Sequence, residues 1–183
     1  TYYQLGEYPL AVLHYKRAGQ LMPRSEVVKR NLAQALNKNG LNVTENRRFL
    51  DVLLGKNLLS LPERIELFFV LAVLALVFTS GWLWTKNPWL SKVAAFFLIP
   101  AVIALMNLIV TYYFSPVDAV LTHAVELRRD AGNQFAKVGE TPIPGGTSVE
   151  VISTTPNGRW LKVVAPGGDL GFVPSEAVKL VDL

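Results

Sequence analysis

The chain has 183 residues, of which 51% are hydrophobic, and it carries a formal net charge of +4. It contains no cysteine, which excludes disulfides, thiolate metal sites and cysteine nucleophiles. The basic residues are spread along the chain without a Lys/Arg run, so we predict no nucleic-acid partner. The segments on either side of the central apolar region are too short to bury the core of a large enzyme.

Residues 1–40 place aromatic and small residues at the spacing of a helical repeat. Gly6 is expected to form a left-handed turn, and Ala11 and Ala18 lie seven residues apart on one helix face. Tyr15 lies between them and would fill the gap against a preceding helix. This spacing resembles the tetratricopeptide repeat, a helix–turn–helix unit of about 34 residues.

Proline and capping residues predict where the helices of this region end and begin. Pro23 is expected to stop the helix that contains Ala11, and Ser25 to begin the next one, Glu26–Lys38. A further helix from Thr44 to Gly55 is expected to cap the array, so the repeat region with its capping helix covers 1–58. On the repeat pattern Thr1 falls inside a helix, so we expect this region to be truncated and preceded by further repeats.

Four hydrogen-bond donors lie on one side of the helix Glu26–Lys38. In tetratricopeptide repeats the first helix of each unit lines a groove that takes partner peptides. The matching positions here are Arg30, Gln34, Asn37 and Lys38. Such donors suit a carboxylate or a peptide backbone, which makes these residues a candidate protein-binding site. The alternative is a helix face that only contacts solvent.

Two long apolar segments, Leu67–Thr85 and Val93–Phe114, are separated by Lys86–Lys92. A helix of about 20 mostly apolar residues crosses a bilayer, so the sequence predicts a transmembrane hairpin over 59–115 with spans at about 66–85 and 93–114. A pair of buried helices in a soluble core is the alternative, although such helices are usually shorter and carry some charge. A hairpin would place both flanks on the same side of the membrane.

Polar residues predict where the hairpin begins and how its helices interact. Ser60 and Glu63 form a capping-box pattern at the start of the first helix. Pro100 is expected to kink the second helix. Asn107 could hydrogen-bond to Thr79 or to a partner helix, which makes the two a candidate helix–helix contact.

The loop between the spans carries Lys86 and Lys92 and no acidic residue. Cytoplasmic loops are enriched in Lys and Arg near the membrane, so this density favours a cytoplasmic loop over 86–92. The longer flanks carry more basic residues but mix them with acids, and a simple count favours the opposite orientation. We predict from the loop that both soluble parts lie outside the cytoplasm.

From Asp118 onward the pattern changes to short β-type segments separated by turn residues. The predicted strands are Ala119–Leu121, Val125–Arg128, Ser148–Ile152, Trp160–Val164 and Gly171–Val173. Five short strands within 118–183 predict a small all-β barrel.

The same residues resemble a bacterial SH3-like domain, most specifically through Gly168-Asp-Leu-Gly-Phe-Val173. Domains of this type bind peptides, including cell-wall peptides. The resemblance makes Trp160 a candidate peptide-binding residue, with Phe172 and Phe135 as neighbours. The alternative is that Trp160 covers the barrel core.

The chain offers little catalytic chemistry. His14 and His123 each lack a second ligand at metal spacing, and no nucleophile motif is present. We therefore predict no catalytic residue, no metal site and no cofactor.

The order of repeat helices, membrane hairpin and SH3-like barrel resembles the BatE-type proteins of bacterial Bat (Bacteroides aerotolerance) clusters. The resemblance implies a multi-domain inner-membrane protein with periplasmic soluble domains that is not an enzyme. It implies a scaffold that works beside membrane proteins with von Willebrand factor A domains and a MoxR-type AAA+ ATPase. The alternative function is a sensor that binds cell-wall peptides or peptidoglycan through the barrel.

Overall fold

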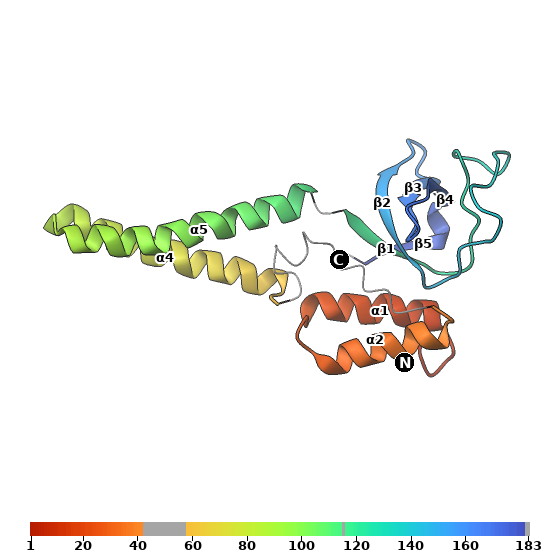
Figure 1. Ribbon diagram of the computed structural model, residues 1–183, viewed down its shortest axis with the longest axis horizontal. Helices are drawn as coiled ribbons and strands as arrows, with labels where there is room; N and C mark the ends of the chain where they lie inside the picture. The colour runs from red at the N-terminus through yellow and green to blue at the C-terminus, as the bar shows by residue number, and fades with distance from the viewer. Residues whose placement is uncertain (42–57, 115, 182–183) are drawn as a thin grey trace. The chain divides into compact units, whose positions relative to one another are not determined.

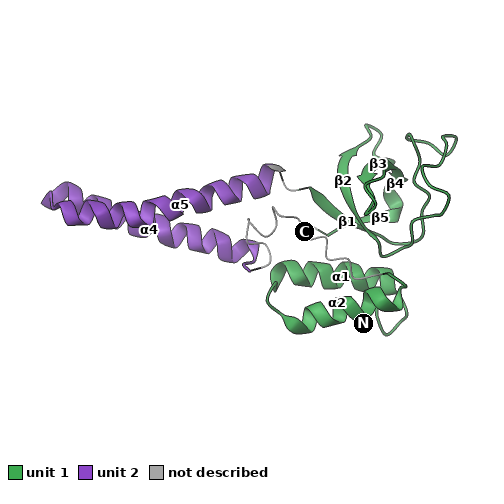
Figure 2. Cartoon of the chain, viewed as in Figure 1, with its two compact units in different colours: residues 1–46, 116–183 green, residues 47–115 purple. Residues whose placement is uncertain are grey.

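The computed structural model describes residues 1–41, 58–114 and 116–181. The chain divides into two compact units (Figure 2). Unit 1 combines Thr1–Asn46 with Pro116–Leu183, and unit 2 is Arg47–Ser115. The predicted capping helix from Thr44 to Gly55 lies outside the described residues.

Unit 1 begins with two antiparallel helices, α1 (Tyr8–Leu21) and α2 (Glu26–Lys38) (Figure 1). Their ends agree with the sequence prediction. Gly6 adopts the left-handed conformation at φ 80°, α1 ends before Pro23, and the Ser25 side chain accepts a hydrogen bond from the backbone of Val28. Residues 2–6 form hydrogen-bonded turns, whereas the repeat pattern placed Thr1 inside a helix.

The five strands of unit 1 form one antiparallel sheet in the order β4-β3-β2-β1-β5. They are β1 (Val117–Leu121), β2 (Ser148–Thr154), β3 (Trp160–Val164), β4 (Leu170–Pro174) and β5 (Val178–Leu180), with a 3₁₀ turn η1 (Ser175–Ala177) before β5. Four of the five predicted strands are confirmed within a few residues. β5 was not among the predicted strands.

The predicted strand Val125–Arg128 is wrong, because this segment makes only isolated bridges. Val125 pairs with Ile143, and Arg128 pairs with Lys137 and Phe172. Ile143 lies between two prolines, which lack the backbone N–H that a continuous ladder needs. The segment instead packs closely over β4. A Cβ added to Gly171 would lie 2.5 Å from Leu127 Cγ, so glycine is required at this position.

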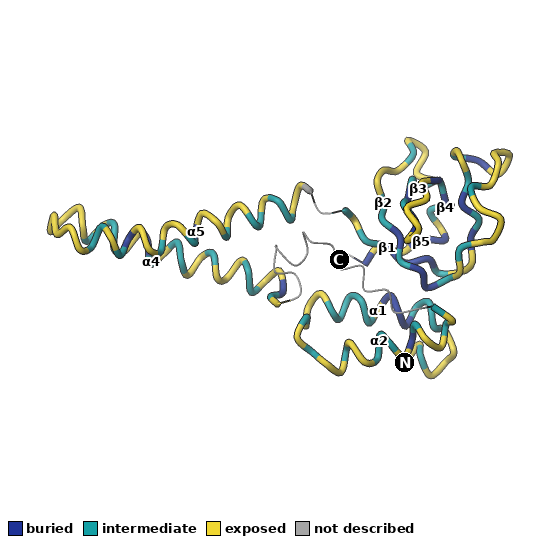
Figure 3. Tube along the Cα trace, in the orientation of Figure 1, coloured by how far each residue is buried: buried dark blue, intermediate teal, exposed yellow. Residues whose placement is uncertain are grey.

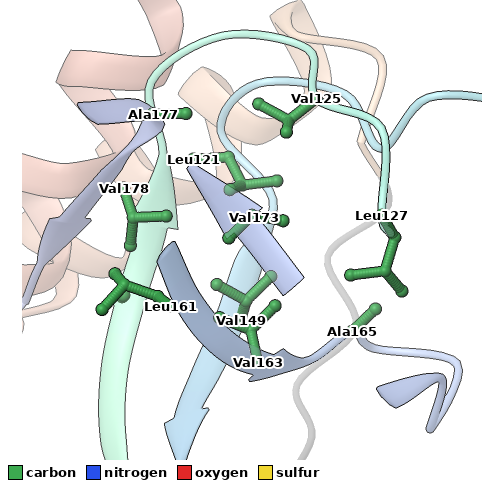
Figure 4. Packing of buried hydrophobic residues seen from close by; sticks show 11 residues of the cluster. Leu121, Val125, Leu127, Val149, Leu161, Val163, Ala165, Val173, Ala177 and Val178 are labelled. Atoms are coloured by element: carbon green, nitrogen blue, oxygen red, sulfur yellow. The ribbon is translucent and has the colours of Figure 1, made fainter. Parts of the chain in front are cut away.

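The sheet encloses an apolar core on one face (Figure 4). Strand side chains alternate between faces, and the inward members of β1 and β3 are almost completely buried. The segment 125–127 and η1 close the core from outside the sheet. The cluster contains Ala119, Leu121, Val125, Leu127, Val149, Leu161, Val163, Ala165, Val173, Ala177 and Val178.

A second core joins the helix pair to the sheet. Val120 points away from the first core and is 1% exposed, and Val181 beside it is 2% exposed. These valines pack with residues of α1 and α2 that are buried as deeply, namely Ala11, Val12, Leu13 and Ala35. The repeat helices and the strands were predicted as separate domains, whereas in the structure they share this core within one unit.

Two hydrogen bonds support the junction between the helix pair and the sheet. The Arg17 guanidinium donates to the Leu180 carbonyl at 2.8 Å, and the Asn39 side-chain amide donates to the Gly145 carbonyl. Figure 3 shows continuous buried stretches in β1 and α1, which meet here. Both bonds connect residues that are more than one hundred positions apart in sequence.

Unit 2 is a pair of long helices, α4 (Leu61–Thr85) and α5 (Pro88–Phe114). The predicted capping box is confirmed, since the Ser60 backbone N–H donates to Glu63 Oε2 at 2.8 Å. The connection is shorter than the predicted loop 86–92. Asn87 Oδ1 accepts a hydrogen bond from the Trp89 backbone, so α5 begins at Pro88 and already contains Lys92.

Both helices are long and apolar enough to cross a membrane. Only 6% and 11% of their most apolar windows are buried. A helix in a soluble core would bury most of this surface, whereas a lipid-facing helix exposes it. Large apolar side chains therefore cover the outside of the pair, for example Leu76 at 70% and Phe96 at 71% exposure.

The two helices contact each other through small and aromatic residues. Ala75, Ala94 and Ala101 are buried in the contact, and Phe78 stacks on Phe97 with ring centroids 5.6 Å apart. Small residues allow the close approach on which helix association in lipid depends.

Asn107 and Thr79 were expected to form a polar contact between α4 and α5. Asn107 is half-buried on α5. The Thr79 hydroxyl donates to the Ala75 carbonyl of its own helix at 2.7 Å, so its proton is not available for Asn107. The α5 helix continues through Pro100.

We predict that Val120→Ala destabilises the whole of unit 1. The change removes buried methyl groups from the second core and should lower the free energy of unfolding by about 1–3 kcal/mol. Chemical denaturation of the full chain in mild detergent would measure this. Val27→Ala is the matched control, because Val27 is 65% exposed and its truncation should cost less than about 0.5 kcal/mol. Equal effects of the two changes would contradict the packing of the helices on the sheet.

Candidate functional sites on unit 1

The first candidate site, which we call the helix hollow, is a depression of about 430 Å³ lined by Tyr3, Gln34, Asn37 and Lys38. Gln34, Asn37 and Lys38 are spaced by three and four residues, so they lie on one side of α2. The turn before α1 places Tyr3 opposite them, and its ring packs against Tyr8 at 5.6 Å. The hollow therefore presents amide groups, a phenol and an ammonium group together.

The structure brings together three of the four residues predicted for protein binding. Gln34, Asn37 and Lys38 are exposed and line the helix hollow, whereas Arg30 is exposed on α2 and does not line it. Tyr3 was not predicted for this site, because it belongs to a turn outside the helix pattern. The donors can bind a carboxylate or peptide carbonyl groups, and Lys38 supplies a positive charge.

The second candidate site, the sheet hollow, has a volume of about 180 Å³. Trp160 and Pro174, which are opposite each other on β3 and β4, form its apolar side. The remaining lining comes from the segment that crosses the end of the sheet, with His123, Ala124, Val125, Glu126, Arg128 and Asn133. An aromatic ring beside polar groups is suited to a peptide side chain or backbone segment.

The three predicted aromatic residues take different positions around the sheet. Trp160 is half-buried and lines the sheet hollow without belonging to the sheet core. Phe172 lies on the same outer face of the sheet but contacts Lys162, whose Nζ is 6.0 Å from the ring centroid. Phe135 is 38% exposed in the segment before β2, where its backbone carbonyl accepts a hydrogen bond from Arg128.

An ionic cluster fixes one side of the sheet hollow. One carboxylate oxygen of Glu126 pairs with Lys137 and the other with Arg128. The hydrogen bond from Lys137 lowers the pKa of the Glu126 carboxyl below its ordinary value of 4.5, and the charges of Lys137 and Arg128 act in the same direction. Arg128 also donates to the Phe135 carbonyl. The cluster therefore connects residues 126 and 128 with residues 135 and 137 of the same segment.

The two histidines take part in local contacts. The His14 ring stacks on Tyr2 at 5.0 Å, and Nδ1 of His123 lies 3.0 Å from the Thr122 hydroxyl. Among residues 1–41, 58–114 and 116–181, no group of three or more His, Cys, Asp or Glu side chains is arranged to hold a metal ion.

We predict that Glu126→Gln reduces the acid sensitivity of unit 1. Because folding lowers the pKa of Glu126, its ion pairs stabilise the fold above about pH 4.5 and lose that contribution as the pH falls through the lowered value. The wild-type chain should therefore be more thermally stable than the variant near neutral pH, and the difference should shrink on acidification. Circular-dichroism melting curves over this pH range would measure it, with Glu140→Gln as an exposed control on the same segment.

Comparison with known proteins gives no further guidance to the role of these hollows. No protein-family model matches the chain, and no curated protein sequence matches it. Function therefore has to be inferred from the two hollows and the exposed apolar helices.

Proposed function

We propose that the protein is a non-enzymatic adaptor that is anchored in a membrane and binds partner proteins through the helix hollow. The observation that carries this proposal is the grouping of Tyr3, Gln34, Asn37 and Lys38 around one depression. Uncharged donors and one ammonium group recognise acceptors, such as the carboxylates and carbonyl groups of a peptide, without needing a cofactor.

The helices α4 and α5 supply the anchor. Their apolar outer surfaces need a nonpolar environment, and each helix contains enough residues to cross the hydrocarbon core of about 30 Å. We propose that they insert as a hairpin. This agrees with the shared core of unit 1, because two crossings return the chain to the side of the membrane that it left.

We propose an orientation with the connection between α4 and α5 in the cytoplasm. Lys86 occupies the connection and Lys92 the first turns of α5, and no acidic residue lies between them. Unit 1 would then lie outside the cytoplasm, which in a bacterial inner membrane means the periplasm.

The resemblance to BatE-type proteins suggests the class of partner. Under this proposal the chain is a scaffold in an envelope complex with von Willebrand factor A domain membrane proteins and a MoxR-type ATPase. The helix pair and the sheet would correspond to the tetratricopeptide-repeat and SH3-like parts of that family. The support for this correspondence is the order of the segments along the chain.

A second function is favoured by the position of Trp160 in the sheet hollow. Trp160 and Pro174 offer an apolar surface beside His123 and Asn133, which suits a small peptide such as a cell-wall stem peptide. Under this alternative the protein is a sensor that binds peptidoglycan, and the helix hollow has no ligand of its own. Binding should be tested with the full chain, since residues 118–183 alone would expose Val120 and Val181.

We predict that Gln34→Ala with Lys38→Ala weakens the capture of partner membrane proteins in a tagged pull-down. Both side chains are exposed, so the free energy of unfolding should change by less than about 0.5 kcal/mol per substitution. Lys29→Ala is the matched control, because it removes the same charge from α2 at an exposed pair with Glu26. Arg30→Ala tests whether the binding surface extends beyond the hollow.

The same pull-down separates the two functions. Loss of capture in the Gln34/Lys38 variant, with normal binding to purified peptidoglycan, supports the adaptor. Unchanged capture in that variant contradicts it. Loss of peptidoglycan binding in Trp160→Ala would then assign function to the sheet hollow.

We predict that a protease added to intact spheroplasts removes both segments of unit 1. A reporter on Arg24 of the α1–α2 turn and one on Asn157 of the β2–β3 turn should disappear together, because both turns belong to unit 1. Protection of both reporters would reverse the orientation. Protection of only one would contradict the hairpin itself.

A further inference from the structure

Two adjacent glycines, Gly145 and Gly146, form the turn that precedes β2. They carry no phosphate-loop pattern, because no Gly-Lys-Ser/Thr sequence follows them. The turn instead lies in contact with a residue next to the helix hollow and with a residue of the sheet hollow.

On the helix side the contact is made by Asn39, the residue after Lys38. The Asn39 backbone N–H ends α2 through a hydrogen bond to Ala35, and its side-chain amide donates to the Gly145 carbonyl. A Cβ added to Gly146 would lie 2.3 Å from Asn39 Nδ2. The end of α2 therefore lies directly against the turn.

On the sheet side the contact is made by the backbone of His123, a residue that lines the sheet hollow. A Cβ added to Gly145 would lie 2.9 Å from the His123 Cα atom and 3.2 Å from its backbone nitrogen. The Gly146 N–H donates to the Leu121 carbonyl at 2.6 Å, which attaches the turn to the end of β1. Gly146 also has φ 82°, a conformation that favours glycine.

We propose that the Gly145–Gly146 turn couples the two hollows, so that occupation of the helix hollow changes access to Trp160 in the sheet hollow. This inference rests on the proposed function, because it requires a ligand at the helix hollow. Asn37 and Lys38 end α2 and Asn39 is its C-cap, so a ligand that moves the end of this helix also moves or breaks the Asn39–Gly145 hydrogen bond. The turn packs closely against Asn39 on one side and His123 on the other. A displacement of the turn should therefore also displace the backbone of His123.

The coupling must act in both directions. If occupation of the helix hollow changes the affinity of the sheet hollow for a ligand, occupation of the sheet hollow changes the affinity of the helix hollow by the same factor. A scaffold with this property would bind its partner differently when a peptide occupies the sheet hollow.

The absence of cysteine from the chain allows a direct test without the natural ligand. Gln34→Cys in the full chain, reacted with 2-sulfonatoethyl methanethiosulfonate, places a removable anionic group at the helix hollow. Replacement of Trp82, Trp84 and Trp89 by Phe leaves Trp160 as the single tryptophan, and acrylamide quenching then reports its accessibility. The label should change the quenching constant, and its removal by a thiol reductant should restore the original value.

Two comparisons test whether the change in Trp160 quenching depends on the Gly145–Gly146 turn. The same label on Glu26→Cys, at the other end of α2, should leave Trp160 unchanged. Asn39→Asp keeps the size of the side chain but removes its N–H donors, and it should abolish the effect of the label at position 34, as should Asn39→Ala. Far-UV circular dichroism would show that the variants are folded. If neither folds, the comparison of labels at positions 34 and 26 still decides the question.

The proposal is overturned if the label at position 34 does not alter Trp160 quenching, or alters it equally when Asn39 cannot donate. Such a result would leave the adaptor function intact, because partner capture is measured separately with the Gln34 and Lys38 variants. A loss of capture with no change at Trp160 would therefore mean that the helix hollow binds its partner independently of the sheet hollow.

Discussion

Unit 1 depends on one short strand that is buried on both faces. In β1, Ala119 and Leu121 belong to the core of the sheet, and Val120 between them belongs to the core shared with α1 and α2. Both edges of the strand are also occupied, by β2 and β5. Because side chains alternate along a strand, a shift of one residue would exchange the two faces and disrupt both cores at once. The position of β1 is therefore fixed by packing on every side.

This arrangement explains how the hairpin can interrupt unit 1 in sequence without interrupting its core. The residues that meet in the second core come from α1 and α2 on one side of the hairpin and from Val120 and Val181 on the other. Such a core requires the chain segments before and after unit 2 to meet within unit 1. If α4 and α5 cross a membrane as proposed, the packing of unit 1 requires an even number of crossings, whatever the lysines in the connection indicate.

Local signals predicted most of the elements, and non-local packing accounts for the differences. Ser25 and Ser60 cap their helices as expected, because a cap involves only neighbouring residues. The Asn87 cap was missed because the second span was located from hydropathy alone, and α5 begins before the uncharged segment. The strand β5 has only three residues and a single buried one, Val178, so its sequence has no alternation to detect.

In the candidate sites, too, local spacing predicted some residues and non-local packing brings in the others. Helical spacing was sufficient to group Gln34, Asn37 and Lys38, whereas Tyr3 enters the helix hollow from a turn whose path the spacing does not determine. Trp160 lines the sheet hollow because of its partner across the strands, Pro174, and of the segment that begins at His123. Neither neighbour could be identified from the residues around Trp160 itself.

The split core also has a consequence for the order of events during synthesis. Val12 and Val120 are separated by roughly 110 residues, so at about 5–20 residues per second the ribosome completes α1 many seconds before its partner strand exists. During that interval the apolar side of the helix pair has no sheet to cover it, because all of unit 2 is synthesised before β1. Contacts this distant in sequence also slow folding, since the ends of a long loop must meet before any burial compensates for the lost entropy. The apolar side of the N-terminal helix pair therefore stays uncovered until the later strand has been synthesised.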